Sequence, residues 1–183
     1  MSKIRSVCVF CGSRVGLDDK YREDAIKLGE IFLKNNIQLV YGGGRIGLMG
    51  VIADTLMEGG GSVVGVIPEF LDKLEVGHEK VSELVITNNI HSRKSIMFER
   101  ADAFVTLPGG IGTLEETFEI ATWKQLGLHS KPVIILNTKR YWKGLSGLID
   151  NIIAEEFGNH NLRDVIKLVH TPEEVLTAFD KCK

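Results

Sequence analysis

The sequence has few cysteines, little net charge and no long hydrophobic run, and each absence excludes a class of protein. Its three cysteines are odd in number and lack metal-ligand spacing, which is typical of a reducing compartment rather than of a disulfide-stabilised secreted domain. The net charge of −2 does not support a broad surface for nucleic acid or membrane. No apolar run is long enough to span a bilayer, so we expect a cytoplasmic protein.

Two kinds of site are also missing. The five histidines lack the spacing of a metal site. Neither glycine-rich turn is followed by Gly-Lys-Ser or Gly-Lys-Thr, which excludes the nucleotide-binding P-loop. What remains is a chain of 183 residues, 44% hydrophobic and 25% charged, an ordinary composition for a globular protein. We expect residues 1–183 to form a single nucleotide-binding domain.

Short apolar runs alternate with segments of helical periodicity along the chain. Strands are predicted at 7–10, 37–41, 62–67, 84–87, 103–107, 132–136 and 165–169. Residues 69–83 show neither pattern and are predicted to form a mobile loop with one helical turn. The alternation predicts an α/β fold, a Rossmann-like doubly wound parallel sheet with helices on both faces. Ligands of such sheets bind outside the carboxyl ends of the strands.

The stretch at residues 107–116, Leu-Pro-Gly-Gly-Ile-Gly-Thr-Leu-Glu-Glu, follows the fifth predicted strand and begins a helix. Its three glycines allow a sharp turn and a close approach of the backbone to a ligand. The free amides and the dipole of the new helix favour an anion. We therefore predict a phosphate-binding turn, with Glu115 and Glu116 one turn behind it. Residues 113–116 also fit a capping box, which would by itself account for Glu116.

Two other turns follow predicted strands and can face the same crevice. Residues 11–14, which include Ser13, follow the first strand. Residues 42–50 match the dinucleotide pattern G-x-G-x-x-G, but the next strand has no acidic residue at its end to hold a ribose, which argues against a nicotinamide cofactor. We prefer a ligand-facing turn at Gly43 and Gly44, because three consecutive glycines weaken a fold unless the backbone must be exposed. The alternative is that these glycines only permit close packing.

Arg93 and Lys94 begin the helix after the fourth predicted strand. Two cations at the positive end of a helix oppose its dipole, so this position is favourable only if an anion lies nearby. A solvated surface pair is the alternative. Their place at the carboxyl end of another strand favours a role in the site.

Together these motifs resemble one known family. Residues 108–113, Pro-Gly-Gly-Ile-Gly-Thr, followed by Glu116, are similar to the P-G-G-x-G-T-x-x-E signature of the LONELY GUY (LOG) proteins. These are cytokinin riboside 5′-monophosphate phosphoribohydrolases, long mislabelled as lysine decarboxylases. Segments at 10–13, 41–50, 91–94 and 122–129 agree with the family as well. The likeness runs from the first strand to about residue 137.

The resemblance implies hydrolysis of the N-glycosidic bond of a nucleoside 5′-monophosphate, AMP or N6-prenylated AMP, with no cofactor. It implies catalytic roles for Arg93 and Glu116. With the two turns above, the expected substrate-binding residues are Glu75, Lys94, Gly109, Gly110, Ile111, Gly112, Thr113, Leu114, Glu115, Thr122, Gly43, Gly44 and Ser13. A lysine decarboxylase would need a lysine joined to pyridoxal phosphate and a partner for the ring nitrogen, and the sequence shows no such constellation.

We expect a homodimer, with the helix that contains Trp123 as a candidate interface, and no nucleic-acid or membrane partner. Two other functions remain open. One is a broader purine or pyrimidine nucleoside monophosphate nucleosidase. The other is a non-catalytic nucleotide-binding or sensing module, because a fold alone does not decide between them.

Overall fold

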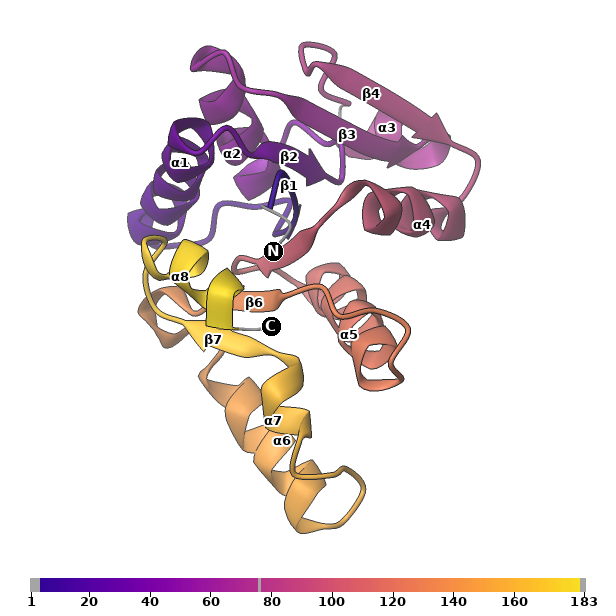
Figure 1. Ribbon diagram of the computed structural model, residues 1–183. Helices are drawn as coiled ribbons and strands as arrows, with labels where there is room; N and C mark the ends of the chain where they lie inside the picture. The colour runs from indigo at the N-terminus through magenta and orange to yellow at the C-terminus, as the bar shows by residue number, and fades with distance from the viewer. Residues whose placement is uncertain (1–3, 76, 182–183) are drawn as a thin grey trace.

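The computed structural model describes residues 4–75 and 77–181, without the side chains of residues 73–75, and its strands form one parallel sheet (Figure 1). The strands are β1 (Ser6–Phe10), β2 (Gln38–Tyr41), β3 (Val63–Pro68), β4 (Glu83–Thr87), β5 (Ala103–Thr106), β6 (Val133–Leu136) and β7 (Lys167–Val169). The helices are α1 (Asp19–Lys34), α2 (Gly47–Glu58), α3 (Glu69–Glu75), α4 (Ile90–Arg100), α5 (Ile111–Gln125), the 3-10 helix η1 (Thr138–Arg140), α6 (Lys143–Ala154), α7 (Leu162–Val165) and α8 (Glu174–Lys181). The predicted α/β class is confirmed.

The order of the strands places a crevice beside β1. The sheet runs β4-β3-β2-β1-β5-β6-β7, and every neighbouring pair is parallel. The chain therefore builds outward from β1 to β4 and then returns to the other side of β1 with β5. At such a reversal the loops after the two strands lead to opposite faces and leave a crevice outside their carboxyl ends. Here those loops are the turn after β1 and the glycine-rich turn after β5.

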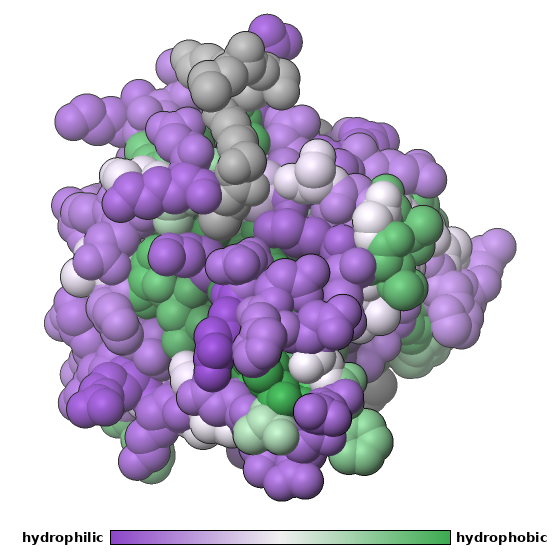
Figure 2. Space-filling view, turned by 60° about the horizontal axis from the view of Figure 1, so that its bottom comes forward, coloured by the Kyte–Doolittle hydropathy of each residue, from purple (hydrophilic) through white to green (hydrophobic). Residues whose placement is uncertain are grey.

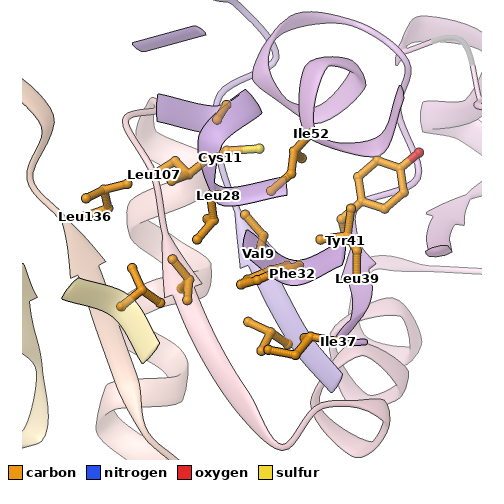
Figure 3. Close-up of a cluster of buried hydrophobic side chains, with 14 of the residues drawn as sticks. Val9, Cys11, Leu28, Phe32, Ile37, Leu39, Tyr41, Ile52, Leu107 and Leu136 are labelled. Atoms are coloured by element: carbon orange, nitrogen blue, oxygen red, sulfur yellow. The ribbon is translucent and has the colours of Figure 1, made fainter. Parts of the chain in front are cut away.

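Side chains alternate between the two faces of the central strands, and this alternation builds two cores. In β1, Val7 and Val9 pack with α1, α2 and α8, whereas Cys8 and Phe10 pack with α4, α5, α6 and α7. Figure 1 shows these two groups of helices on opposite sides of the sheet. Figure 3 shows the first core, where Phe32 of α1 lies against the strands. The central strands are continuous apolar runs because both of their faces are covered.

The segment after β3 differs from its prediction. Seven of its residues form the helix α3, which is longer than the single turn expected. Glu69 and Asp72 lie in its first turn, where acidic side chains complement the helix dipole. The amide of Gly77 then donates to the carbonyl and to the carboxylate of Asp72, at 3.3 and 3.0 Å, which closes the connection. The sequence did not reveal this helix because seven residues with charges between the apolar ones are too short for a clear helical period.

The surface is mostly polar on the face shown in Figure 2. Hydrophobic side chains there lie in separate patches among hydrophilic ones. None of the helices formed by residues 4–75 and 77–181 has both the length and the apolar character needed to cross a membrane.

His129 gives the fold a predicted dependence on pH. Its Nε2 lies 2.9 Å from the carbonyl oxygen of Ile120, and its Nδ1 accepts a hydrogen bond from the Lys131 amide at 3.1 Å, an arrangement that suits the neutral ring protonated at Nε2. Burial lowers the pKa of His129 below its ordinary value of 6.5 and outweighs the opposing effect of the Ile120 carbonyl. The unfolded chain therefore binds more protons as the pH falls through about 6.5, which destabilises the folded state.

We expect the melting temperature to fall between about pH 7 and about pH 5, and to fall less steeply in His129→Gln. Thermal melts of both proteins over this range measure the difference. Carboxylates that titrate in the same range act equally in both proteins. Parallel curves would therefore show that His129 does not contribute.

Candidate active site

A cavity of about 280 Å³ lies at the carboxyl ends of β1 and β5. All three turns that were predicted to face one crevice contribute to it. The residues that line it are Val9, Phe10, Cys11, Gly12, Ser13, Gly42, Met49, Arg93, Gly110, Ile111, Gly112, Thr113 and Glu116. The cavity therefore joins an arginine, a carboxylate and a helix N-terminus in one space.

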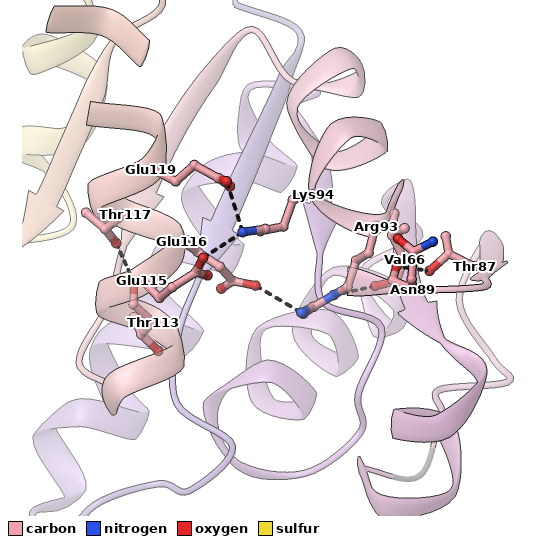
Figure 4. A network of polar contacts seen from close by, with 10 residues as sticks. All are labelled: Val66, Thr87, Asn89, Arg93, Lys94, Thr113, Glu115, Glu116, Thr117 and Glu119. Atoms are coloured by element: carbon pink, nitrogen blue, oxygen red, sulfur yellow. Dashed lines mark hydrogen bonds and ion pairs between the residues drawn. The ribbon is translucent and has the colours of Figure 1, made fainter. Parts of the chain in front are cut away.

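Arg93 of α4 and Glu116 of α5 face each other across this cavity (Figure 4). The Nη1 atom of Arg93 lies 3.0 Å from Oε1 of Glu116, and the two side chains are only 10% and 12% exposed. The Nε of Arg93 donates to the carbonyl oxygen of Val66 in β3 at 3.0 Å. The guanidinium is thus fixed from two directions. A buried ion pair is expensive to desolvate and is weak evidence for stabilisation, so its position in a cavity favours a functional role.

Gly42 makes room for this arginine. A Cβ atom at Gly42 would lie 2.2 Å from Nη2 of Arg93, closer than any real contact. The two glycines that follow lie elsewhere. Gly43 has a φ of +79° and packs against β3, and Gly44 pairs with Gly77 in an isolated antiparallel bridge. The structure therefore brings Gly42 to the cavity and places Gly43 and Gly44 against neighbouring backbone.

Gly42→Ala is expected to displace the Arg93 guanidinium, because the new methyl group occupies its space while Val66 and Glu116 hold it in place. We expect kcat for AMP, the substrate that the sequence resemblance implies, to fall by at least about tenfold, since catalytic groups tolerate little misplacement. Steady-state kinetics on AMP measures this effect. Gly147→Ala is the matched control, because a Cβ there meets nothing within 4 Å. Equal kinetics of Gly42→Ala and the native protein would contradict the assigned role.

Lys94 binds the carboxylates of α5 rather than lying free in solvent (Figure 4). Its Nζ lies 2.6 Å from Oε1 of Glu115 and 3.0 Å from Oε1 of Glu119. Burial lowers the pKa of Lys94, but the hydrogen bonds to both carboxylates outweigh that effect and raise it above its ordinary value. The two cations at the start of this helix are therefore not a solvated surface pair, and the anions beside them are carboxylates of the neighbouring helix.

The amides at the start of α5 open toward the cavity. The helix begins at Ile111, and its N-cap Gly110 has extended backbone and no side-chain hydrogen bond to the first turn. The first amide bonded within the helix is that of Leu114, which donates to the Gly110 carbonyl. The amides at 111–113 therefore precede the helical hydrogen-bond ladder, and with the helix dipole they favour an anion in the cavity.

The predicted capping box at residues 113–116 is wrong. Thr113 is the third residue of α5 rather than its N-cap, because the extended backbone of Gly110 starts the helix three residues earlier. The Thr113 side chain is buried, and a Cβ at Gly109 would lie 2.2 Å from its Oγ1. Glu116 points across the cavity to Arg93 instead. Helix capping therefore does not account for Glu116.

Several predicted residues lie outside the cavity. Gly109 lines a neighbouring cavity, and Leu114 packs against the core beneath α5. Thr122 is exposed, 11 residues after the first residue of α5 and so roughly 16 Å further along the helix. Glu75 is the last residue of α3, and its side chain lies outside the described residues.

Val66, Met49 and Glu119 contribute to the site but were not among the residues predicted from the sequence. Val66 supplies a backbone carbonyl, which no side-chain motif can reveal. Met49 has the spacing of a core residue and lines the cavity as well. Glu119 could have been found, because it lies four residues after Glu115 and so shares its helix face.

Comparisons with known proteins give this geometry a context. The family model described as "Possible lysine decarboxylase" matches residues 49–179. A probable cytokinin riboside 5′-monophosphate phosphoribohydrolase of Oryza sativa subsp. japonica is 45% identical over 179 residues, which cover 98% of this chain and 72% of that protein. A cytokinin riboside 5′-monophosphate phosphoribohydrolase of Arabidopsis thaliana is 42% identical over 180 residues, covering 98% and 84%. The Moco carrier protein of Chlamydomonas reinhardtii superposes with a TM-score of 0.71 at 18% identity, covering 98% of both chains, which shows a shared fold alone.

Proposed function

The chain belongs to the LONELY GUY family of phosphoribohydrolases, and on that premise we propose that it hydrolyses the N-glycosidic bond of AMP or of an N6-prenylated AMP. The products are the free base and ribose 5-phosphate. The observation that carries the proposal is the Arg93–Glu116 pair, which lies in one cavity with the open N-terminus of α5.

The helix terminus suits the phosphate of such a substrate. The amides at 111–113 and the dipole of α5 favour a dianionic group at this end of the cavity. Ser13 lines the same cavity from the turn after β1, where its hydroxyl is available to a phosphate or a ribose. This arrangement favours a 5′-monophosphate over a nucleoside, because a nucleoside leaves the amides without an anion.

Glu116 suits the chemistry of the bond that breaks. Cleavage of an N-glycosidic bond develops positive charge on the ribose, and a fixed carboxylate stabilises that charge. Water adds to C1′ as the C1′–N bond breaks, and the bonding electron pair leaves with the base. One proton of the water passes to the base and the other stays on the new hydroxyl. Glu116 can also orient this water or a ribose hydroxyl, while Arg93 fixes the direction of its carboxylate.

A substrate panel tests the proposal and separates it from its alternatives. We expect base release, followed by chromatography, from AMP or isopentenyladenosine 5′-monophosphate. Equal turnover of CMP would instead indicate a broader nucleosidase. Tight binding of these nucleotides in calorimetry without any base release would contradict the enzyme and favour a nucleotide-binding module.

The proposal includes a homodimer formed through α5. Phe118 on this helix, and Leu126 and Leu128 just after it, are 37%, 67% and 68% exposed, large values for apolar side chains. Trp123 packs edge to face on Phe98 at 5.1 Å, so it supports the helix from within. Exposed apolar side chains grouped on a helix that is packed in this way are typical of a protein–protein interface. Sedimentation velocity of the native protein tests this, and a monomer at micromolar concentration would contradict it.

The remaining parts of the proposal are a cytoplasmic location, a single domain, and no membrane or nucleic-acid partner. Cys8 is a buried free thiol, which suits a reducing compartment. Every strand of the described chain belongs to one sheet, which supports a single domain.

A further inference from the structure

The turn that leads into α5 is held by a side chain from another part of the fold. Tyr141, the residue after η1, donates a hydrogen bond from its hydroxyl to the carbonyl oxygen of Gly109 at 2.6 Å. From the turn after β1, the amide of Gly12 donates to the carbonyl oxygen of Pro108 at 3.0 Å. These bonds fix Pro108 and Gly109, which precede the N-cap Gly110 and the open amides of α5. The position of those amides therefore depends on them.

Open space beside this turn makes the hydrogen bonds important. A second cavity, of about 350 Å³, is lined by Tyr21 and Tyr141 together with residues 108–110. A Cβ at Gly110 would meet nothing within 4 Å. Glycine backbone is conformationally permissive, and on this side Gly110 is not confined by packed side chains, whereas Gly109 packs against Thr113 and the backbone of Gly12. The hydrogen bond from Tyr141 then helps to set the place of the turn on its cavity side, where packing does not.

Tyr141 is itself held firmly. The two residues before it, Lys139 and Arg140, have φ values of 50° and 60°, in the left-handed region that residues with a Cβ rarely adopt. Thr138 anchors this segment by donating to the buried carboxylate of Asp24 at 2.6 Å. The Tyr141 ring packs edge to face against Tyr21, with the ring centroids 5.8 Å apart. Strained backbone that the surrounding structure maintains is often found beside functional sites.

We propose that Tyr141 is a positioning residue for the phosphate-binding turn. Its hydroxyl holds the Gly109 carbonyl so that the amides at 111–113 meet the 5′-phosphate of the substrate. Tyr141 acts through Gly109 and does not itself touch the reacting atoms. The inference rests on the proposed function and assigns to it a residue that no sequence motif of the site contains.

Tyr141→Phe removes the hydroxyl and keeps the ring. We expect KM for AMP to rise about threefold to tenfold, the equivalent of one net hydrogen bond, with kcat changed by less than about twofold. The phosphate is bound alike in the ground and transition states, so the loss falls on binding. The inhibition constant of ribose 5-phosphate should rise by the same factor, because that product carries the same phosphate.

Tyr21→Phe is the matched control, since it removes the same atom from the neighbouring ring. It should leave both constants unchanged. Unchanged constants in Tyr141→Phe, or equal effects of the two variants, would overturn the inference while leaving the proposed function intact. If the native protein releases no base from AMP, the proposed function fails. The dissociation constant of AMP, measured by calorimetry, then tests Tyr141 by the same expected threefold to tenfold rise.

Discussion

Glu116→Gln is expected to slow base release from AMP by about a thousandfold, with little change in KM. The amide keeps the size of the side chain and can still accept a hydrogen bond from Arg93, so the cavity should keep its shape. It lacks the negative charge that stabilises the developing positive charge on the ribose. Steady-state kinetics with product chromatography measures the loss, and circular dichroism shows whether the variant remains folded at the assay temperature.

Two further variants sharpen this test. Glu116→Asp keeps the charge but withdraws it by one methylene group, so its rate should lie between those of the native protein and Glu116→Gln. Glu99→Gln changes an exposed carboxylate on α4 and should leave the rate unchanged. Base release by Glu116→Gln at the native rate would contradict the catalytic role of Glu116.

Arg93→Lys is expected to reduce both activity and stability, although the charge is kept. Arginine donates to the Val66 carbonyl from Nε and to Glu116 from Nη1, and a single ammonium cannot reproduce this fork. We expect the free energy of unfolding to fall by about 2 kcal/mol, because a buried partner loses its donor. We also expect kcat/KM for AMP to fall by about a hundredfold through the misplaced carboxylate. Urea unfolding and steady-state kinetics measure the two effects.

Arg100→Lys is the matched control on the same helix. Arg100 forms its ion pair with Glu83 at the surface, where both side chains are 44% exposed and the pair is screened by solvent. It should change neither stability nor activity. A native unfolding midpoint in Arg93→Lys would contradict the claim that the guanidinium is held from two directions.

The parts of the fold that the sequence predicted are those set by local patterns. Apolar runs such as 133–136 are continuous because both faces of the sheet are covered, and strands buried in this way leave that pattern in any sequence. Asp18 caps α1 by accepting a hydrogen bond from the Lys20 amide at 3.0 Å, and caps of this kind are local features because the side chain acts within its own turn. The three turns line one cavity because the order of the strands places the carboxyl ends of β2, β1 and β5 side by side.

The parts that could not be predicted depend on contacts between distant residues. The conformation of Gly110, which moved the start of α5, leaves no signal in neighbouring side chains. Gly42 is required by Arg93, which is distant in sequence. The hydrogen bond from Tyr141 to Gly109 likewise joins segments that only the tertiary fold brings together. In each case the feature depends on the backbone of a glycine, and a sequence motif does not specify that glycine's conformation or its distant contacts.

The description of the family as possible lysine decarboxylases does not suit the lysine at this site. A lysine that forms a Schiff base must act as a neutral amine. Lys94 binds Glu115 and Glu119, and after the opposing effect of burial its pKa still lies above the ordinary value. The carboxylates hold it as an ammonium ion, which suits electrostatic positioning rather than covalent chemistry.

The most direct test of the central claim is product analysis after incubation of the native protein with AMP, with Glu116→Gln alongside. We predict adenine and ribose 5-phosphate in equal amounts from the native protein, and neither from the variant on the same timescale. Adenosine with inorganic phosphate would show that the phosphate ester had been cleaved instead. That result, or equal adenine release by the two proteins, would contradict the account.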